Sequence, residues 1–269
     1  IAGGFIQRFY IFSFFVLPIY YMKNTKQYIK YVIPILFLIF FVGIILSGNR
    51  MPLILFLLSI SLILVFQKQA RKYFLSFVLI FPIIFIIIFN SNSKVKTNFI
   101  SFYDQISKIV VITSKGNFDD KEAPQYLKEF SSFYETWKLN KYIGGGIKSF
   151  RYYCHVRKNI NENSKFVCNM HPHNYYLEIL TETGLLGFVI ILSIFLMTLY
   201  LSFYKKYISK SKLLDNNIII PFIFLFFIEI FPLKSTGSFF TTGNATYIFL
   251  ILAILIGLVR KDNLIENKN

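Results

Sequence analysis

The chain has 269 residues, of which 55% are hydrophobic and 19% aromatic, and its mean hydropathy is +0.56. Soluble domains are much less apolar, so the composition excludes a protein whose main solvent is water. A formal net charge of +16 would on its own favour nucleic acid, so the distribution of the charge has to be examined first.

Basic residues form four clusters, in alternate segments between the apolar runs. They are Lys23, Lys26 and Lys30; Lys68, Arg71 and Lys72; Lys205, Lys206, Lys210 and Lys212; and Arg260, Lys261 and Lys268. Cytoplasmic loops of membrane proteins carry this excess of lysine and arginine. We therefore expect all four clusters in the cytoplasm, membrane lipids around the chain, and no nucleic-acid partner.

Seven apolar runs approach the length of about 20 residues that a helix needs to cross a bilayer. They lie near 5–22, 31–47, 52–66, 74–90, 183–203, 218–233 and 244–259. The prediction is an all-α, polytopic transmembrane helix bundle with spans in 1–90 and 183–269, a large, partly helical periplasmic loop at 91–182, and a short cytoplasmic tail. Because the chain begins with Ile1 rather than Met, we expect it to be a piece of a longer protein, preceded by an odd number of further spans.

Within the long loop, Leu127, Phe130, Tyr134 and Trp137 recur at helical spacing, and Pro124 suits the first turn of such a helix. We expect this aromatic stripe to pack on the membrane surface or on the bundle rather than to bind a ligand.

The sixth apolar run contains one acidic residue, Glu229, with Lys234 just beyond it. An ionised group inside a membrane is costly unless it is paired. We expect Glu229 to pair with a lysine or arginine near the interface rather than to relay protons.

Both cysteines, Cys154 and Cys168, fall in the long loop. In a bacterium with two membranes this loop would lie in an oxidising compartment, which favours a disulfide with an entropic effect of roughly 3 kcal/mol. Two buried free thiols are the alternative. A zinc site is disfavoured, because the two cysteines lack the short spacing of structural zinc ligands.

The segment from His171 to Gly187 runs from the end of the loop into the fifth apolar run. Pro172 can open a helix there, which would place Asn174, Glu178 and Glu182 on one polar stripe. Histidine exchanges a proton near neutral pH and so suits a base that activates a hydroxyl. Interfacial polarity and helix capping explain the same residues equally well.

Three motifs carry a family resemblance. They are His173-Asn-Tyr-Tyr-Leu-Glu-Ile-Leu180 with Thr181-Glu-Thr-Gly-Leu-Leu-Gly187, the stretch Tyr142-Ile-Gly-Gly-Gly-Ile-Lys-Ser-Phe-Arg151, and the outer turn Leu46-Ser-Gly-Asn-Arg50. In type and order they resemble the motifs of the O-antigen ligase and O-antigen polymerase superfamily. The histidine motif is fairly specific, whereas the other two are weak on their own.

The resemblance implies transfer of a glycan from an undecaprenyl diphosphate carrier to a hydroxyl of a glycan or lipid A core acceptor, at the periplasmic face of the bacterial inner membrane. It implies His173 as the base, with His171 as the alternative and Asn174 and Glu182 in supporting roles. Glu182 would set the tautomer of the histidine or simply face water. The arginines expected to hold the diphosphate are Arg50, Arg151 and Arg157.

No cofactor and no metal ion are expected, because the sequence has no carboxylate cluster of the kind that holds a divalent ion beside phosphates. The amides of Gly144, Gly145 and Gly146 would either approach phosphate or form a flexible turn. A transporter or flippase of lipid-linked glycan is the alternative function. It would call for charged or broken helices near the middle of the membrane, and the inner runs are almost uncharged.

Overall fold

The computed structural model describes residues 8, 29–66, 68–115, 124–157, 168, 171–208, 218–234 and 237–266. Every regular element in these ranges is a helix, which confirms the all-α prediction. The chain divides into two compact units. Unit 1 comprises Ile1–Phe102, Leu199–Glu229 and Ile251–Asn269, and unit 2 comprises Tyr103–Thr198 and Ile230–Leu250.

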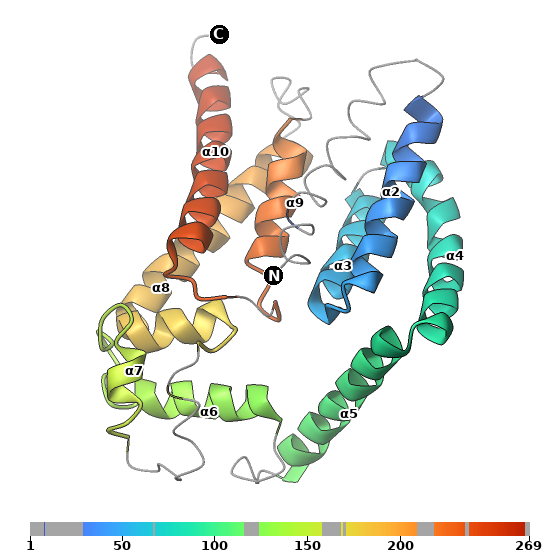
Figure 1. Cartoon of the computed structure of the whole chain (residues 1–269). Coiled ribbons are helices and arrows are strands. Elements are labelled where there is room, and N and C mark those ends of the chain that lie inside the picture. Colours follow the sequence, from blue (N-terminus) through green and yellow to red (C-terminus); the bar gives the residue numbers. More distant parts are fainter. Residues whose placement is uncertain are drawn as a thin grey trace. The chain divides into compact units, whose positions relative to one another are not determined.

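The helices follow one another along the chain as labelled in Figure 1. They are α2 (Ile29–Leu46), α3 (Arg50–Phe66), α4 (Lys68–Ser91), α5 (Ser93–Lys115), α6 (Gln125–Trp137), α7 (Phe150–Tyr153), α8 (Tyr175–Phe203), the π-helical turn η2 (Tyr204–Ile208), α9 (Ile219–Glu229) and α10 (Thr242–Glu266). Helices α2, α3, α4, α8, α9 and α10 overlap six of the seven predicted spans, and the first predicted span, 5–22, lies outside the described residues except for Arg8.

Two described segments, Tyr175–Ile208 and Thr242–Arg260, are long and apolar enough to cross a membrane. The pair Leu79–Ser91 and Ser93–Ile112 adds a third candidate if it forms one broken span, although it bends by 107°. Helices α3 and α9 are apolar but shorter. A membrane protein is therefore supported by these helices, and the full set of seven spans stays a prediction.

The bend between α4 and α5 falls on a stretch that was expected to begin the long loop. Asn92 interrupts the helix, and its side-chain oxygen accepts the amide of Val95 at 3.1 Å. This is the usual way in which asparagine caps a helix, so the polar stretch starts a new helix instead of an irregular loop. Residues 93–115 are helical as a result, which agrees with the expectation of a partly helical segment.

The core of unit 1 is aromatic where α2, α3 and α4 meet. Phe41, Phe56 and Phe81 come from these three helices, and their ring centroids lie 4.2 to 5.4 Å apart. All three side chains are buried. Aromatic pairs at this spacing add to the energy of area burial, so this cluster fixes how the three helices pack against one another.

Glu229, at the end of α9, is buried and forms an ion pair with Arg8 at 2.7 Å. The expectation that Glu229 pairs with a basic residue is confirmed. The partner, however, comes from the first predicted span, whereas the sequence had directed attention to Lys234. The pair ties residues that are 221 positions apart and belong to the same unit.

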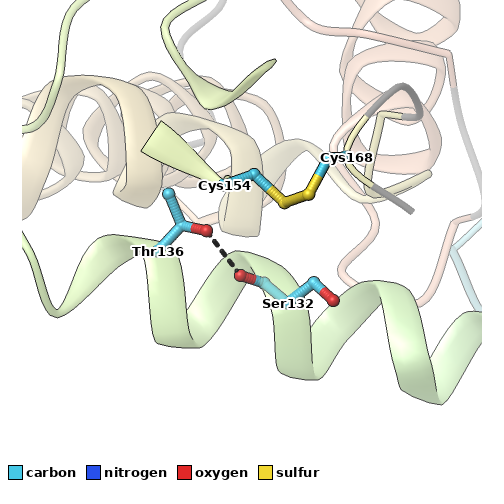
Figure 2. Close-up of a disulfide and its surroundings, with 4 residues drawn as sticks. All are labelled: Ser132, Thr136, Cys154 and Cys168. Carbon is cyan, nitrogen blue, oxygen red and sulfur yellow. Dashed lines mark hydrogen bonds between the residues drawn. A yellow bond between two sulfur atoms is a disulfide. The ribbon is translucent and has the colours of Figure 1, made fainter. Parts of the chain in front are cut away.

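The core of unit 2 contains the predicted disulfide between Cys154 and Cys168, which the structure confirms. Both cysteines are fully buried in a cluster with Phe133 of α6 and Phe150 of α7, whose rings stack with centroids 3.5 Å apart. Figure 2 shows the disulfide over the face of α6 that carries Ser132 and Thr136. The disulfide therefore links the C-terminal end of α7 to Cys168, and both cysteines pack in the same cluster as Phe133 of α6.

Helix α6 confirms the amphipathic segment, but the buried face is not the aromatic one. Glu129, Ser132, Phe133 and Thr136 are buried, which is also helical spacing. The aromatic stripe is left outward, since Phe130 and Tyr134 are 36% and 47% exposed. Packing of this stripe on the bundle or on the membrane surface stays a prediction.

Candidate functional site

The two histidines of the motif lie together immediately before α8. Their ring centroids are 4.2 Å apart, and both side chains are half-buried. The backbone of His173 has a φ of 49°, in the left-handed region, where a residue with a Cβ is strained by roughly 1–2 kcal/mol. Residues held in this way against their preference are found disproportionately at functional sites.

Asn174 holds His173 in place through the backbone. Its side-chain oxygen accepts the amides of Tyr176 and Leu177 at 2.9 and 3.1 Å, so Asn174 is the N-cap of α8. Its side-chain nitrogen donates to the carbonyl of Pro232 at 2.8 Å, and the Tyr176 hydroxyl donates to the nearby carbonyl of Ile230. The helix therefore begins after Asn174 and not at Pro172, and capping, one of the two interpretations of this motif, is confirmed.

His171 has an electrostatic environment that favours its neutral form. Burial lowers the pKa of His171 below its usual value, and the charges of His173 and Arg151 lower it further. Arg151 is an exposed residue of α7, close enough to His171 for its charge to act there. Arg151, one of the three arginines predicted to hold diphosphate, therefore lies within electrostatic range of His171.

The other two arginines lie in different surroundings. Arg157 also belongs to unit 2, where it is only 7% exposed, so its guanidinium is not simply solvated. Arg50 belongs to unit 1, at the first residue of α3. Its guanidinium donates to the Ser101 hydroxyl at 2.9 Å and lies 5.3 Å from the centre of the Phe102 ring.

The glycine turn, residues 141–148, lies against a break in α8. Gly184 has φ 67° and ψ −171°, which interrupts the helix and leaves backbone groups on both sides without helical partners. The turn supplies these partners. The four hydrogen bonds run from Gly145 N to Thr181 O, from Gly146 N to Glu182 O, from Leu185 N to Lys141 O and from Leu186 N to Tyr142 O.

Gly144 and Gly184 make this contact possible because neither has a side chain. A Cβ on Gly144 would lie 2.3 Å from the carbonyl oxygen of Glu182, and one on Gly184 would lie 2.4 Å from the amide nitrogen of Gly144. Both distances are far below a van der Waals contact. These glycines therefore allow the turn to pack closely against α8. The amides of Gly145 and Gly146, which were possible phosphate ligands, donate instead to the carbonyls of Thr181 and Glu182.

Glu182 completes the attachment of the turn to α8. It is 4% exposed, and its carboxylate accepts the backbone amide of Lys148 at 2.7 Å. The interpretation that Glu182 faces water is therefore wrong. Its role in setting the tautomer of a histidine stays a prediction. Glu178, one turn earlier, is also buried and accepts hydrogen bonds from Ser238 and from the amide of Phe239.

Two residues beside His173 were not found from the sequence. The Tyr126 ring meets the His173 ring edge-on, with centroids 5.9 Å apart, and Glu129 is close enough for the charge of His173 to affect it. Both belong to the start of α6, where the aromatic stripe is the more prominent pattern in the sequence. The signal that reveals Glu129 is the second set of helically spaced residues in the same segment, 129, 132, 133 and 136.

Metal binding would need several ligands close together. Among the described residues, no group of three or more His, Cys, Asp and Glu side chains has the arrangement of a metal site.

A protein-family model described as O-antigen ligase matches residues 35–192, more than half of the chain. The matched region contains Arg50, the glycine turn, Arg151, the disulfide and both histidines. No curated protein and no solved structure matches the chain.

Proposed function

Because the chain belongs to the O-antigen ligase family, which implies a membrane enzyme of the glycosyltransferase type, we propose that it transfers a glycan from undecaprenyl diphosphate to a sugar hydroxyl. The acceptor is a lipid A core or a growing glycan. The reaction takes place at the periplasmic face of the bacterial inner membrane. The observation that supports this proposal most strongly is the His171 and His173 pair, held on strained backbone at the capped start of α8.

In the proposed reaction His173 is the base. The acceptor hydroxyl oxygen forms a bond to the anomeric carbon of the donor, and its proton passes to the imidazole. The bond between that carbon and the diphosphate oxygen breaks, and the electron pair leaves with the lipid diphosphate. His171, whose pKa is lowered by burial and nearby positive charge, is the second candidate for the proton acceptor.

The departing diphosphate gains negative charge, which a cationic site has to stabilise. Arginine suits this task, because its guanidinium is permanently charged and binds phosphate oxygens through two parallel hydrogen bonds. We propose Arg151, whose charge acts on His171, for this role, together with Arg50 and Arg157. We propose that these arginines act without a metal ion, so transfer should continue in excess chelator.

Replacing His173 by Ala tests the assignment of the base. The purified variant should lose transfer from a defined lipid-linked donor by about 10²–10⁴-fold, the usual contribution of a general base. Resistance of the buried Cys154–Cys168 disulfide to mild reductant should be unchanged, which shows that unit 2 is folded. His171→Ala, assayed in the same way, tests the second candidate: transfer lost in His171→Ala and kept in His173→Ala would assign the base to His171. A full rate in His173→Ala would remove His173 from the mechanism. In a separate experiment, transfer measured in strains that lack either a core acceptor or a polymerase distinguishes ligase activity from polymerase activity.

A further inference from the structure

Glu129 is fixed deep in unit 2, on the inner face of α6. Its side chain is 1% exposed, and it shares this face with Phe133, whose ring stacks on Phe150 next to the disulfide. The Thr181 hydroxyl donates to the Phe133 carbonyl at 3.2 Å, which ties α6 to α8. The position of Glu129 relative to the start of α8 is therefore set by a core contact, a disulfide and a hydrogen bond.

The carboxylate of Glu129 is incompletely paired. One oxygen accepts a hydrogen bond from the Gln125 amide at 3.2 Å, whereas the other, Oε2, is buried and accepts none from any residue that the structure describes. Burying a carboxylate without a full set of donors costs several kcal/mol, so such a group is retained only where something else compensates for it. Burial raises the pKa of Glu129, and the hydrogen bond from Gln125 and then a positive charge on His173 partly offset this effect, so Glu129 would stabilise an imidazolium at His173.

The neighbourhood of Glu129 also orients the His173 ring. Tyr126, on the turn of α6 that precedes Glu129, meets that ring edge-on, and the strained backbone of His173 aims it toward this end of α6. A carboxylate behind a histidine is a familiar catalytic arrangement. It accepts the N–H of one ring nitrogen, which leaves the other nitrogen free to take a proton, and it stabilises the imidazolium that forms.

We propose that Glu129 is a positioning residue for His173 in glycan transfer. This inference rests on the proposed function, in which His173 is the base. Glu129 stays ionised and takes no proton in the step itself: the acceptor proton goes to His173, the new bond forms at the anomeric carbon, and the leaving electron pair goes to the diphosphate. Oε2, the oxygen without a described donor, is the atom that receives the imidazole N–H as the substrates bind.

The test compares Glu129→Gln, Glu129→Asp and Glu135→Gln in the full-length purified protein. Glutamine keeps the size of the side chain and removes its charge, while aspartate keeps the charge on a shorter side chain. Glu135 is the matched control, because it lies on the same helix and its carboxylate pairs with Lys138 at the surface at 2.7 Å. Transfer is measured over a range of lipid-linked donor concentrations, so that kcat and KM are obtained separately.

For Glu129→Gln we expect kcat to fall about 10- to 100-fold, part of the roughly 10²–10⁴-fold that a general base contributes, with the donor KM within about twofold of the unaltered protein. Glu129→Asp should recover part of this loss, and Glu135→Gln should be unaffected. If the carboxylate were purely structural, Glu129→Gln would instead lower the melting temperature together with the rate, and Glu129→Asp would restore neither.

The role of Glu129 is overturned if Glu129→Gln keeps its rate, or if the Gln and Asp variants lose it equally. The comparison of Glu129→Gln with Glu129→Asp keeps the test decisive even where Glu129→Gln folds poorly. His173→Ala, assayed alongside, separates the two levels of the argument. Loss in His173→Ala with a normal rate in Glu129→Gln refutes only the role of Glu129. A normal rate in His173→Ala removes His173 as the base, whereas no transfer by the unaltered protein refutes the proposed function on which both roles rest.

Discussion

Substitution of Gly144 by alanine should detach the glycine turn from α8. The added Cβ would lie 2.3 Å from the Glu182 carbonyl oxygen and 2.5 Å from the Gly184 amide nitrogen, and both are backbone atoms that cannot rotate away. The turn has to withdraw, and its four backbone hydrogen bonds to the helix break are then lost. At about 1 kcal/mol each, with a further 1 kcal/mol or so for alanine at φ 71°, the expected destabilisation is about 3–5 kcal/mol.

Thermal unfolding in detergent measures this effect, as a fall in melting temperature on the order of 10 °C. Gly146→Ala is the matched control, since Gly146 also has a positive φ, of 100°, but a Cβ there meets nothing within 4 Å. It should lose only the conformational part, about 1 kcal/mol. Gly257→Ala, in α10 with open space around it, should be neutral or slightly stabilising. Equal melting temperatures for Gly144→Ala and Gly146→Ala would refute the close-contact argument.

Three further predictions follow from other contacts. Replacing Cys154 and Cys168 by serine opens a loop with a sequence separation of 14 and should destabilise unit 2 by about 3 kcal/mol, seen as faster proteolysis of this unit; unchanged proteolysis would contradict it. Because burial raises the pKa of Glu129 above 4.5, the folded state binds its proton more tightly than the unfolded state, and stability falls as the pH rises through the folded pKa. Glu129→Gln should therefore melt higher than the unaltered protein at pH 7, with a difference that closes toward pH 4, and a pH-independent difference would count against this. Arg8→Met leaves the Glu229 charge buried and should cost about 3–5 kcal/mol in thermal unfolding, most of it restored by adding Glu229→Gln; no restoration would show that the ion pair is not the cause.

Helix positions in the apolar parts of the chain could be predicted from the sequence, because length and hydrophobicity there leave few alternatives. The run 31–47 became α2 at Ile29–Leu46, and 52–66 became α3 at Arg50–Phe66. Helix α5 was hidden because its sequence is polar and follows an Asn-Ser stretch that is typical of loops. The same asparagine that suggests a loop is a good N-cap, and only the structure shows which of the two applies.

Within the site, residues whose role follows from their type and order in the sequence could be predicted more easily than residues whose role depends on the folded structure around them. The His171 and His173 pair and the Cys154–Cys168 disulfide follow from residue type and order along the chain. Glu129 does not, because its importance depends on which face of α6 is buried. An aromatic stripe usually turns inward in a soluble domain, and here it turns outward while a carboxylate is buried. Such an inversion makes sense when aromatic side chains have a membrane surface available.

The glycine turn and the histidine motif are separated by about thirty positions in the sequence, yet they act as one structural unit. The break at Gly184 divides α8 into a short first segment, which Asn174 caps directly after His173, and a long apolar segment. Without the turn the break would leave backbone groups unpaired, and a continuous helix would be favoured. A continuous helix would redirect the first segment and move His173 away from α6. The three adjacent glycines therefore keep the proposed base, His173, in place, and Gly144→Ala should reduce the proposed transfer reaction even though Gly144 itself does no chemistry.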